Sequence, residues 1–216
     1  MKKFYIYFRY VPFLLFSLNA FGNIDDYFLH PIGPSASNYG NTGIIDVPNA
    51  RFMGPASLRF GFSSSYPFEY TSLTATPFSW FEATYRYTEL KNRKYGQSFY
   101  SGNQSLKDKG FDVKLLLLEE KSILPSIALG LRDIAGTGLF SSEYIAASKL
   151  IGNVDVTLGM AWGTKSNGNI NNPLTKLDSR FSSRIRDVDG DTQGGEINFQ
   201  TFFGGKKAAL FGGVEI

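Results

Sequence analysis

Apolar and polar residues alternate along much of the chain from about residue 43 onward. In FEATYRYT (81–88) every second residue is apolar or aromatic, and the residues between them are Glu82, Thr84, Arg86 and Thr88. Successive side chains of a β-strand point to opposite faces, so this period of two predicts strands with one apolar and one polar face. The same period occurs in LRFGF (58–62), FDVKLLLLEE (111–120) and VDVTLGMAWG (154–163).

Shorter segments extend this pattern into a chain of strands. They are TSLTAT (71–76), SIALGLR (126–132), YIAASKL (144–150), EINFQTFF (196–203) and AALFGGVEI (208–216). The run LLLLEEKSIL (115–124) fits either a helical turn or a buried strand, because periodicity alone does not separate the two. Polar connections rich in Gly, Ser and Asn occupy 91–109 and 164–195. We therefore predict an all-β antiparallel meander with short and long loops.

Two classes of β protein differ in what surrounds the apolar face of the sheet. A soluble sandwich buries its apolar faces, whereas an outer-membrane barrel turns its apolar face to lipid and places aromatic residues at both interfaces. The aromatic content of 16% favours an outer-membrane β-barrel, or the first part of one, over a soluble periplasmic carbohydrate-binding β-sandwich. The expected aromatic girdle is Trp80, Phe81, Tyr85, Tyr87, Tyr144 and Trp162. The expected lining of a lumen or sugar path is Glu82, Arg86, Lys114, Arg132, Asp155 and Lys149. Lumen charges that only neutralise one another are the alternative.

The N-terminus has the pattern of an export signal. MKKFYIYFRY carries three positive charges and no acidic residue, and the apolar run VPFLLFSLNAFG (11–22) follows. We predict a signal peptide over 1–22, a polar lead-in over 23–42 and a β domain over 43–216. Cleavage after Gly22 would take the formal net charge from +3 to 0. The basicity then belongs to the signal, so no nucleic-acid partner is expected.

Composition and motifs exclude several kinds of chemistry. The sequence has no Cys and a single His, which excludes disulfides, a lipidated cysteine and multi-histidine metal sites. GLRDIAGTGLFSSEY (130–144) has the glycines of a phosphate loop but lacks its lysine, so a strand, a turn and a strand are expected. DVDGD (187–191) lacks the closing glutamate of a calcium loop and is expected to be a solvated acidic loop, with a weak Ca²⁺ or sugar contact left open. The adjacent pair Glu119–Glu120 points to opposite faces of a strand, unlike a glycosidase dyad. We expect no enzyme activity, no catalytic or metal site and no cofactor.

Six motifs follow one another along the chain: NYGNTGIIDVPNAR (38–51), PFSWFEATYRY (77–87), KGFDVKLLLLEE (109–120), LPSIALGLRDIAGTGLFSSEYIAASK (124–149), VTLGMAWG (156–163) and GGKKAALFGGVEI (204–216). In this order they resemble the YjbH family of exopolysaccharide-related outer-membrane proteins. The resemblance implies a β-barrel-type protein of the outer membrane that takes part in making or exporting an extracellular polysaccharide. The partners it implies are outer-membrane lipid, a polysaccharide and periplasmic secretion proteins.

Family members are typically much longer than 216 residues, and some are described as lipoproteins. This chain ends at Ile216 inside an expected strand and lacks the terminal aromatic of a finished outer-membrane barrel. A fragment, a split gene product and a small barrel in its own right are therefore all open. The expected location is the outer membrane, with the periplasm as the alternative.

Overall fold

A computed structural model of the protein describes residues 33–166, 168–184 and 202–216. The described residues from Pro34 to Ile216 form one compact unit. The expected signal peptide over 1–22 and the first half of the lead-in over 23–42 lie outside the described residues.

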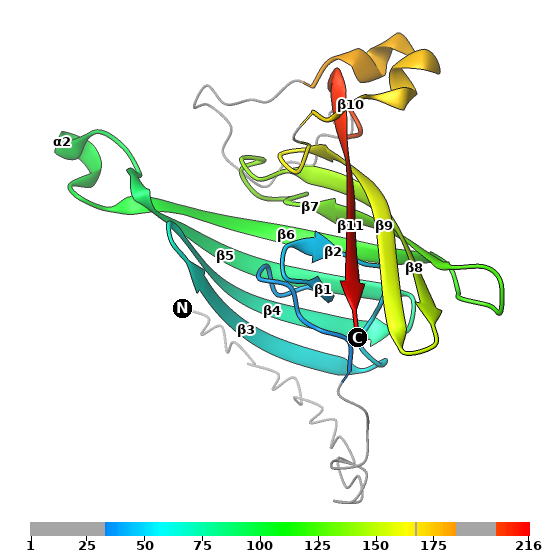
Figure 1. Cartoon of the computed structure of the whole chain (residues 1–216). Helices are drawn as coiled ribbons and strands as arrows, with labels where there is room; N and C mark the ends of the chain where they lie inside the picture. Colours follow the sequence, from blue (N-terminus) through cyan, green and yellow to red (C-terminus); the bar gives the residue numbers. More distant parts are fainter. Residues whose placement is uncertain (1–32, 167, 185–201) are drawn as a thin grey trace, which may run out of the picture. The chain divides into compact units, whose positions relative to one another are not determined.

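The unit is built from an antiparallel sheet, as the alternation predicts (Figure 1). The strands are β1 (Gly43–Ile44), β2 (Val47–Pro48), β3 (Ser57–Ser65), β4 (Phe68–Phe78), β5 (Phe81–Lys94), β6 (Ser105–Leu118), β7 (Ser126–Arg132), β8 (Ser142–Ile151), β9 (Val154–Gly163), β10 (Ile170–Asn171) and β11 (Lys207–Glu215). The main sheet has the order β10-β11-β9-β8-β7-β6-β5-β4-β3, and β1 and β2 form a separate hairpin. The strands from β3 to β9 follow one another in sequence order, so the predicted meander is confirmed.

The boundaries of some elements differ from the expectation. The leucine run begins as strand rather than helix, because β6 continues to Leu118 and pairs with β7, with a register shift between Leu116 and Leu118. The connection expected over 91–109 is much shorter, since β5 and β6 pair as far as Lys94 and Ser105 and leave only a tip with the four-residue helix α2 (Ser98–Ser101). The connection from β9 to β11 contains β10 and the 3₁₀ turns η1 (Pro173–Lys176) and η2 (Ser179–Ser182). Among the described residues, no helix is long and apolar enough to cross a membrane.

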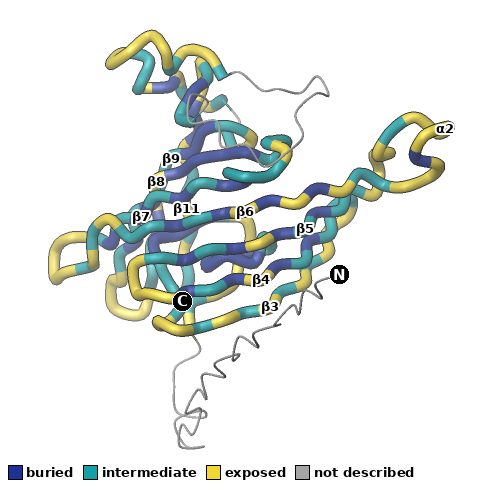
Figure 2. Tube along the Cα trace, turned by 180° about the vertical axis from the view of Figure 1, so that it is seen from behind, coloured by how far each residue is buried: buried dark blue, intermediate teal, exposed yellow. Residues whose placement is uncertain are grey.

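The two faces of the main sheet have opposite polarity. One face is concave and contacts residues 34–55, which we call the inner segment; the other face is convex. Buried and exposed positions alternate along the strands of Figure 2. The buried positions include many charged and hydroxyl side chains, whereas large apolar residues are exposed, among them Leu58, Phe60, Phe62, Leu158 and Leu210. The burial is thus inverted relative to a soluble sandwich, which buries its apolar faces.

The connections differ in length at the two ends of the sheet. At one end, β4–β5 and β8–β9 turn within two residues, and residues 119–125 join β6 to β7. At the other end lie the β5–β6 tip, the β7–β8 connection over 133–141 and the long connection from β9 to β11, together with the two-residue β3–β4 turn. We call these the short-turn end and the long-loop end.

The glycine-rich stretch of the sequence is the β7–β8 connection at the long-loop end. A strand follows it rather than a helix, in agreement with the strand–turn–strand prediction. A Cβ on Gly136 would lie 1.9 Å from Oδ1 of Asp133 and 2.5 Å from the carbonyl oxygen of Lys109. Glycine is therefore required here by the tight packing of the turn against Asp133.

Candidate functional site

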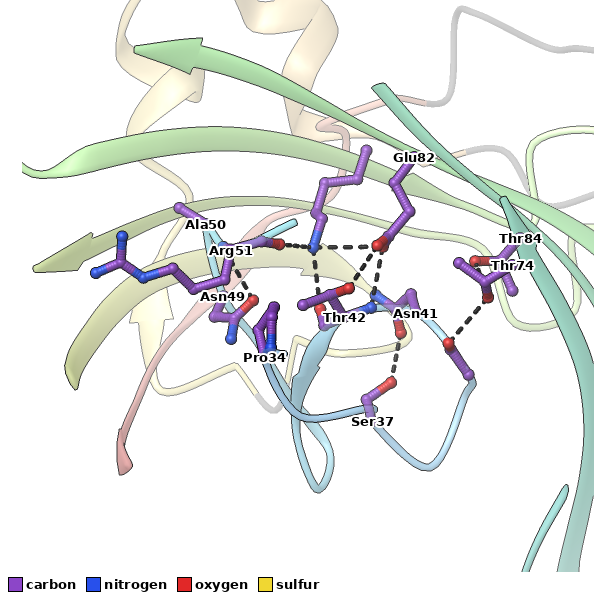
Figure 3. A network of polar contacts seen from close by, with 12 residues as sticks. Pro34, Ser37, Asn41, Thr42, Asn49, Ala50, Arg51, Thr74, Glu82 and Thr84 are labelled. Carbon is purple, nitrogen blue, oxygen red and sulfur yellow. Dashed lines mark hydrogen bonds and ion pairs between the residues drawn. The ribbon is translucent and has the colours of Figure 1, made fainter. Parts of the chain in front are cut away.

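The inner segment lies in the concavity of the sheet and is held there by polar contacts (Figures 1 and 3). Figure 3 shows Ser37, Asn41 and Thr42 of this segment near Glu82, Thr74 and Thr84 of the sheet. The side chain of Thr74 donates a hydrogen bond to the carbonyl oxygen of residue 40, at 2.9 Å. At the other end of the segment, the backbone N–H of Ala50 donates to Oγ of Ser148 at 2.8 Å. The inner segment thus satisfies polar groups of the sheet from β4 across to β8.

A buried ion pair fixes the middle of the inner segment. Glu82 on β5 and Lys114 on β6 are direct cross-strand partners, and their charged groups lie 3.3 Å apart. Glu82 also accepts hydrogen bonds from the backbone N–H of Thr42 at 3.0 Å and from its hydroxyl at 2.5 Å. Lys114 donates to the carbonyl oxygens of Thr42 at 3.0 Å and Arg51 at 2.5 Å. Both charges are therefore hydrogen-bonded as well as paired, as buried charges require.

A second buried charge cluster lies toward the long-loop end. Asp112 on β6 pairs with Arg86 at 3.2 Å and with Arg132 at 3.6 Å, and it accepts a hydrogen bond from the backbone N–H of Asp133 at 2.9 Å. The first residue of the β7–β8 connection, Asp133, has one carboxylate oxygen bonded to the N–H of Phe140, while its other oxygen has no hydrogen-bond partner. Burial, reinforced by other carboxylates nearby, raises the pKa of Asp133 to about 6.

A third network lies at the short-turn end and contains four charged side chains. Arg51 of the inner segment donates two hydrogen bonds to Asp155, at 2.7 and 2.8 Å, and pairs with Glu120 at 2.6 Å. Glu120 also pairs with Lys149 at 2.9 Å. The hydrogen bond to Asp155 raises the pKa of Arg51. Burial alone would raise the pKa of Glu120, but the hydrogen bonds from Lys149 and Arg51 outweigh it and lower that pKa to about 2.

A cavity of about 490 Å³ opens at the long-loop end, between the inner segment and the sheet. Its aromatic wall runs from Tyr39 of the inner segment to Tyr70 at 5.0 Å, then to Phe68 at 5.8 Å and Phe140 at 6.4 Å between ring centroids. Its basic residues are Arg86, Arg93, Arg132 and Lys165. Asp46 is the one acidic residue among the described residues that line it.

The ring of Tyr39 lies among three of these cations. The guanidinium carbon of Arg132 is 3.7 Å from the ring centroid, the ammonium of Lys165 is 4.4 Å away, and the guanidinium carbon of Arg86 is 5.9 Å away. These distances lie within the range of cation–π contacts. The cavity therefore combines stacking surfaces with positive charge.

The structure brings five of the six predicted lining residues to the concave side. Glu82, Arg86, Lys114 and Arg132 are buried there, and Asp155 contacts the inner segment. Lys149 differs, because its register partner is Val156 on the convex face; it reaches Glu120 at the end of the sheet. Of these residues, only Arg86 and Arg132 line the 490 Å³ cavity.

The predicted aromatic girdle divides in three. Trp80 and Phe81 lie at the β4–β5 turn, where Trp80 also stacks with Phe78. Tyr85 and Tyr87 share the convex face of β5. The remaining two, Tyr144 and Trp162, are almost fully buried.

These two buried aromatics have specific partners inside the unit. Tyr144 lies on the concave face, and a Cβ on Gly130 would lie 2.0 Å from its ring. Trp162 donates from Nε1 to Asn172 at 2.9 Å and packs against Phe203. Strand periodicity assigns a face to each residue, but it does not reveal which long connection folds back over a strand.

The sequence did not predict that the inner segment contributes residues to the candidate site. Tyr39 and Thr42 belong to the expected polar lead-in, yet Tyr39 lines the cavity and Thr42 bonds Glu82 of the buried ion pair. The signal that could have indicated this is the excess of charged residues on strand faces, since buried charges need partners. No group of three or more His, Asp or Glu side chains in the described residues could hold a metal ion. The DVDGD stretch (187–191) lies outside the described residues.

Comparison with known proteins then identifies the family. The YjbH family, described as "Exopolysaccharide biosynthesis protein YbjH", matches residues 35–216. The chain belongs to the YjbH family. It is 42% identical over 187 residues to "Uncharacterized lipoprotein YjbH" of Escherichia coli (strain K12), an alignment that covers 86% of this chain and 26% of the relative. The chain thus spans about a quarter of the length of this relative. No solved structure matches the chain significantly.

Proposed function

We propose that this YjbH-family chain is a non-enzymatic outer-membrane β-barrel segment, or the first part of one, that takes part in exopolysaccharide biosynthesis or export. Its polar concave side would form part of a path or docking surface for the polysaccharide. Outer-membrane lipid and periplasmic secretion proteins would be its other partners. The family description supports the link to exopolysaccharide, and the lipoprotein name of the relative supports an exported protein of the cell envelope.

The observation that carries this proposal is the inverted polarity of the sheet. Glu82, Arg86 and Lys114 are each at most 2% exposed, whereas Phe60 and Leu158 are 72% and 66% exposed. Water would favour the opposite arrangement, because each exposed large apolar side chain forgoes about 1.5–3 kcal/mol of burial. Hydrocarbon reverses that preference, so an apolar convex face suits lipid.

The strand lengths also suit a bilayer. A tilted membrane-spanning strand needs about 9–11 residues. In the sheet, β3, β4, β8, β9 and β11 have 9 to 11 residues and β5 and β6 have 14, whereas β7 has 7 and β10 has 2. In outer-membrane barrels the short turns face the periplasm and the long loops face outward. Under the proposal, the cavity at the long-loop end faces the outside of the cell.

Membrane fractionation of the full chain tests this proposal. We expect co-sedimentation with outer membranes, resistance to extraction by urea and a change of gel mobility on boiling. A soluble chain that urea extracts from the membrane fraction would refute the barrel. For the biological role, deletion of the gene should reduce secreted polysaccharide, and the intact gene should restore it. Unchanged secretion after deletion would refute the role in exopolysaccharide.

Single cysteines give the orientation, because the natural sequence contains none. Asn153→Cys places a thiol in the β8–β9 turn at the short-turn end, and Asn103→Cys places one at the β5–β6 tip. We expect a membrane-impermeant maleimide to label only Asn103→Cys in intact cells. Labelling of Asn153→Cys alone would reverse the orientation.

A further inference from the structure

We propose that the cavity at the long-loop end binds a carboxylate-bearing sugar residue of a polysaccharide. The inference deepens the proposed function, since it names the substrate class that the concave side would receive. It rests on three features of the cavity: its volume, its aromatic wall and its excess of basic side chains.

The size and the aromatic wall suit a saccharide. A volume of about 490 Å³ lies within the usual range of small-ligand sites, and it is large enough for one or two sugar rings. Tyr39, Tyr70, Phe68 and Phe140 form a continuous series of ring contacts along one side. The C–H faces of a pyranose ring are apolar and carry slight positive charge, so they stack on the negative faces of aromatic rings.

The charge of the wall selects an acidic sugar over a neutral one. Arg93 is exposed at the cavity, and Arg132 and Lys165 lie against the ring of Tyr39. Arg132 forms an ion pair with Asp112. Among the described residues, no carboxylate lies within 4 Å of the Lys165 ammonium or the Arg93 guanidinium. Arginine and lysine side chains that lack a protein counter-ion are well placed to receive a ligand carboxylate.

Lys165 lies in the cavity beside two other cations, Arg132 and Arg86. Its ammonium donates to the backbone carbonyl oxygen of Asp46 at 2.6 Å. Burial and the neighbouring Arg132 lower the pKa of Lys165 to about 7; Arg86 adds to this, whereas Asp46 and Asp112 oppose it. A bound carboxylate would favour the ammonium form, so binding of an acidic sugar takes up a proton near neutral pH.

The test measures binding of oligogalacturonate by the full chain in detergent micelles, with two matched probes. Fully methyl-esterified oligogalacturonate has the same rings without charge, and short poly-glutamate has carboxylates without rings. We expect oligogalacturonate to bind at least tenfold more tightly than either probe. Its affinity should fall as the pH rises through 7 to 8, where its own carboxylates stay ionised. Equal binding of the ester would overturn the charge argument, and equal binding of poly-glutamate would overturn the sugar argument.

Substitutions of single residues test whether the sugar binds in this cavity. Lys165→Gln should weaken oligogalacturonate binding about tenfold, the value of one charge-assisted hydrogen bond, and should abolish the pH dependence. Arg93→Gln should weaken binding in the same direction without disturbing the buried cluster, because Arg93 is exposed. Lys176→Gln is the control, since Lys176 is an exposed lysine in η1 that does not line the cavity. Equal affinities of all three variants and the natural chain would overturn the assignment.

The experiments distinguish failure of the acidic-sugar site from failure of the proposed outer-membrane function. A chain that integrates into outer membranes and restores secretion, yet binds no oligogalacturonate, refutes the acidic-sugar site and leaves the proposed function standing. A soluble chain that binds oligogalacturonate with the expected variant pattern refutes the barrel and supports the site.

Discussion

Replacing Glu82 by Gln should release the inner segment from the sheet while the strands stay paired. Glu82 is the point where three interactions meet: two hydrogen bonds from Thr42 and the ion pair with Lys114 at 3.3 Å. The backbone ladder of β5 with β4 and β6 does not depend on this side chain. The substitution therefore removes an anchor of the inner segment and leaves the hydrogen bonds of the sheet intact.

The expected cost follows from these contacts. Removing one partner of a buried ion pair costs about 3–5 kcal/mol, because the remaining charge loses its compensation. Glutamine keeps one acceptor oxygen for Thr42, and Lys114 keeps the carbonyl oxygens of Thr42 and Arg51. These remaining bonds place the cost at the lower end, about 3 kcal/mol, which is roughly a 100-fold change in the equilibrium for release.

Hydrogen–deuterium exchange of the full chain in detergent micelles measures that equilibrium. Amides held by the inner segment's contacts, such as those of Thr42 and Ala50, should exchange about 100-fold faster in Glu82→Gln. The amides of the β5–β6 ladder should keep their protection. The double variant Glu82→Gln/Lys114→Met should cost less than the sum of the single variants, because it removes both charges together.

Glu69→Gln is the matched control for Glu82→Gln. Glu69 also pairs with a lysine, Lys91, but this pair lies at the surface, where ion pairs contribute little. It should leave exchange in the inner segment unchanged. Unchanged exchange of Thr42 and Ala50 in Glu82→Gln would refute the anchoring role. Equally faster exchange of every strand would show instead that the inner segment and the sheet open as one unit.

Three further changes test the polarity, packing and titration of the sheet. Leu158→Arg on the convex face should lower the stability of the chain folded in lipid by about 2–4 kcal/mol, measured by urea unfolding, whereas Leu177→Arg in the exposed η1–η2 connection should not. Gly130→Ala should cost about 1–3 kcal/mol in the same assay, because the new methyl group meets the ring of Tyr144. Asp133→Asn should remove a pH dependence of stability. The pKa of Asp133 is about 6 in the folded chain and about 3.9 in the unfolded chain. The free energy of unfolding of the natural chain should therefore fall by about 3 kcal/mol as the pH rises from 4 through 6.

Each of these changes has an outcome that contradicts its reasoning. Equal effects of Leu158→Arg and Leu177→Arg would mean that the convex face does not contact lipid. A neutral Gly130→Ala would mean that the ring of Tyr144 moves freely in the concavity. If the natural chain and Asp133→Asn lose the same free energy of unfolding between pH 4 and 6, Asp133 does not titrate in that range.

The alternation of residues was enough to predict most of the sheet. It assigned the antiparallel meander and placed Glu82, Arg86, Lys114 and Arg132 on one face, because the side-chain period of a strand is two. The same period puts Lys149 on the face of Ile145 and Ala147, so its assignment to the polar lining did not follow from the alternation, and its side chain reaches Glu120 near the end of β8.

The cavity could not be predicted in the same way. Tyr39, Arg86, Phe140 and Lys165 come from the inner segment, β5, the β7–β8 connection and the residues after β9. Their meeting depends on how irregular segments fold over the sheet, and no periodic signal encodes that path. The inner segment itself has only two-residue strands, so its sequence gives no strand pattern to detect.

The charged concave face also restricts the register of the sheet. Glu82 lies opposite Lys114, and Arg86 lies opposite Gly110, where a Cβ would come within 3.1 Å of the guanidinium. A slip of one residue between β5 and β6 would place Glu82 opposite Val113 or Leu115 and turn one strand's charges toward the convex face. Each such charge would leave its partner and meet an apolar surface, at a cost of several kcal/mol. The inner segment adds to this restriction, because it bonds Glu82 and Lys114 at the same time. The contacts that fill the concavity are therefore also contacts that define one pairing of the strands.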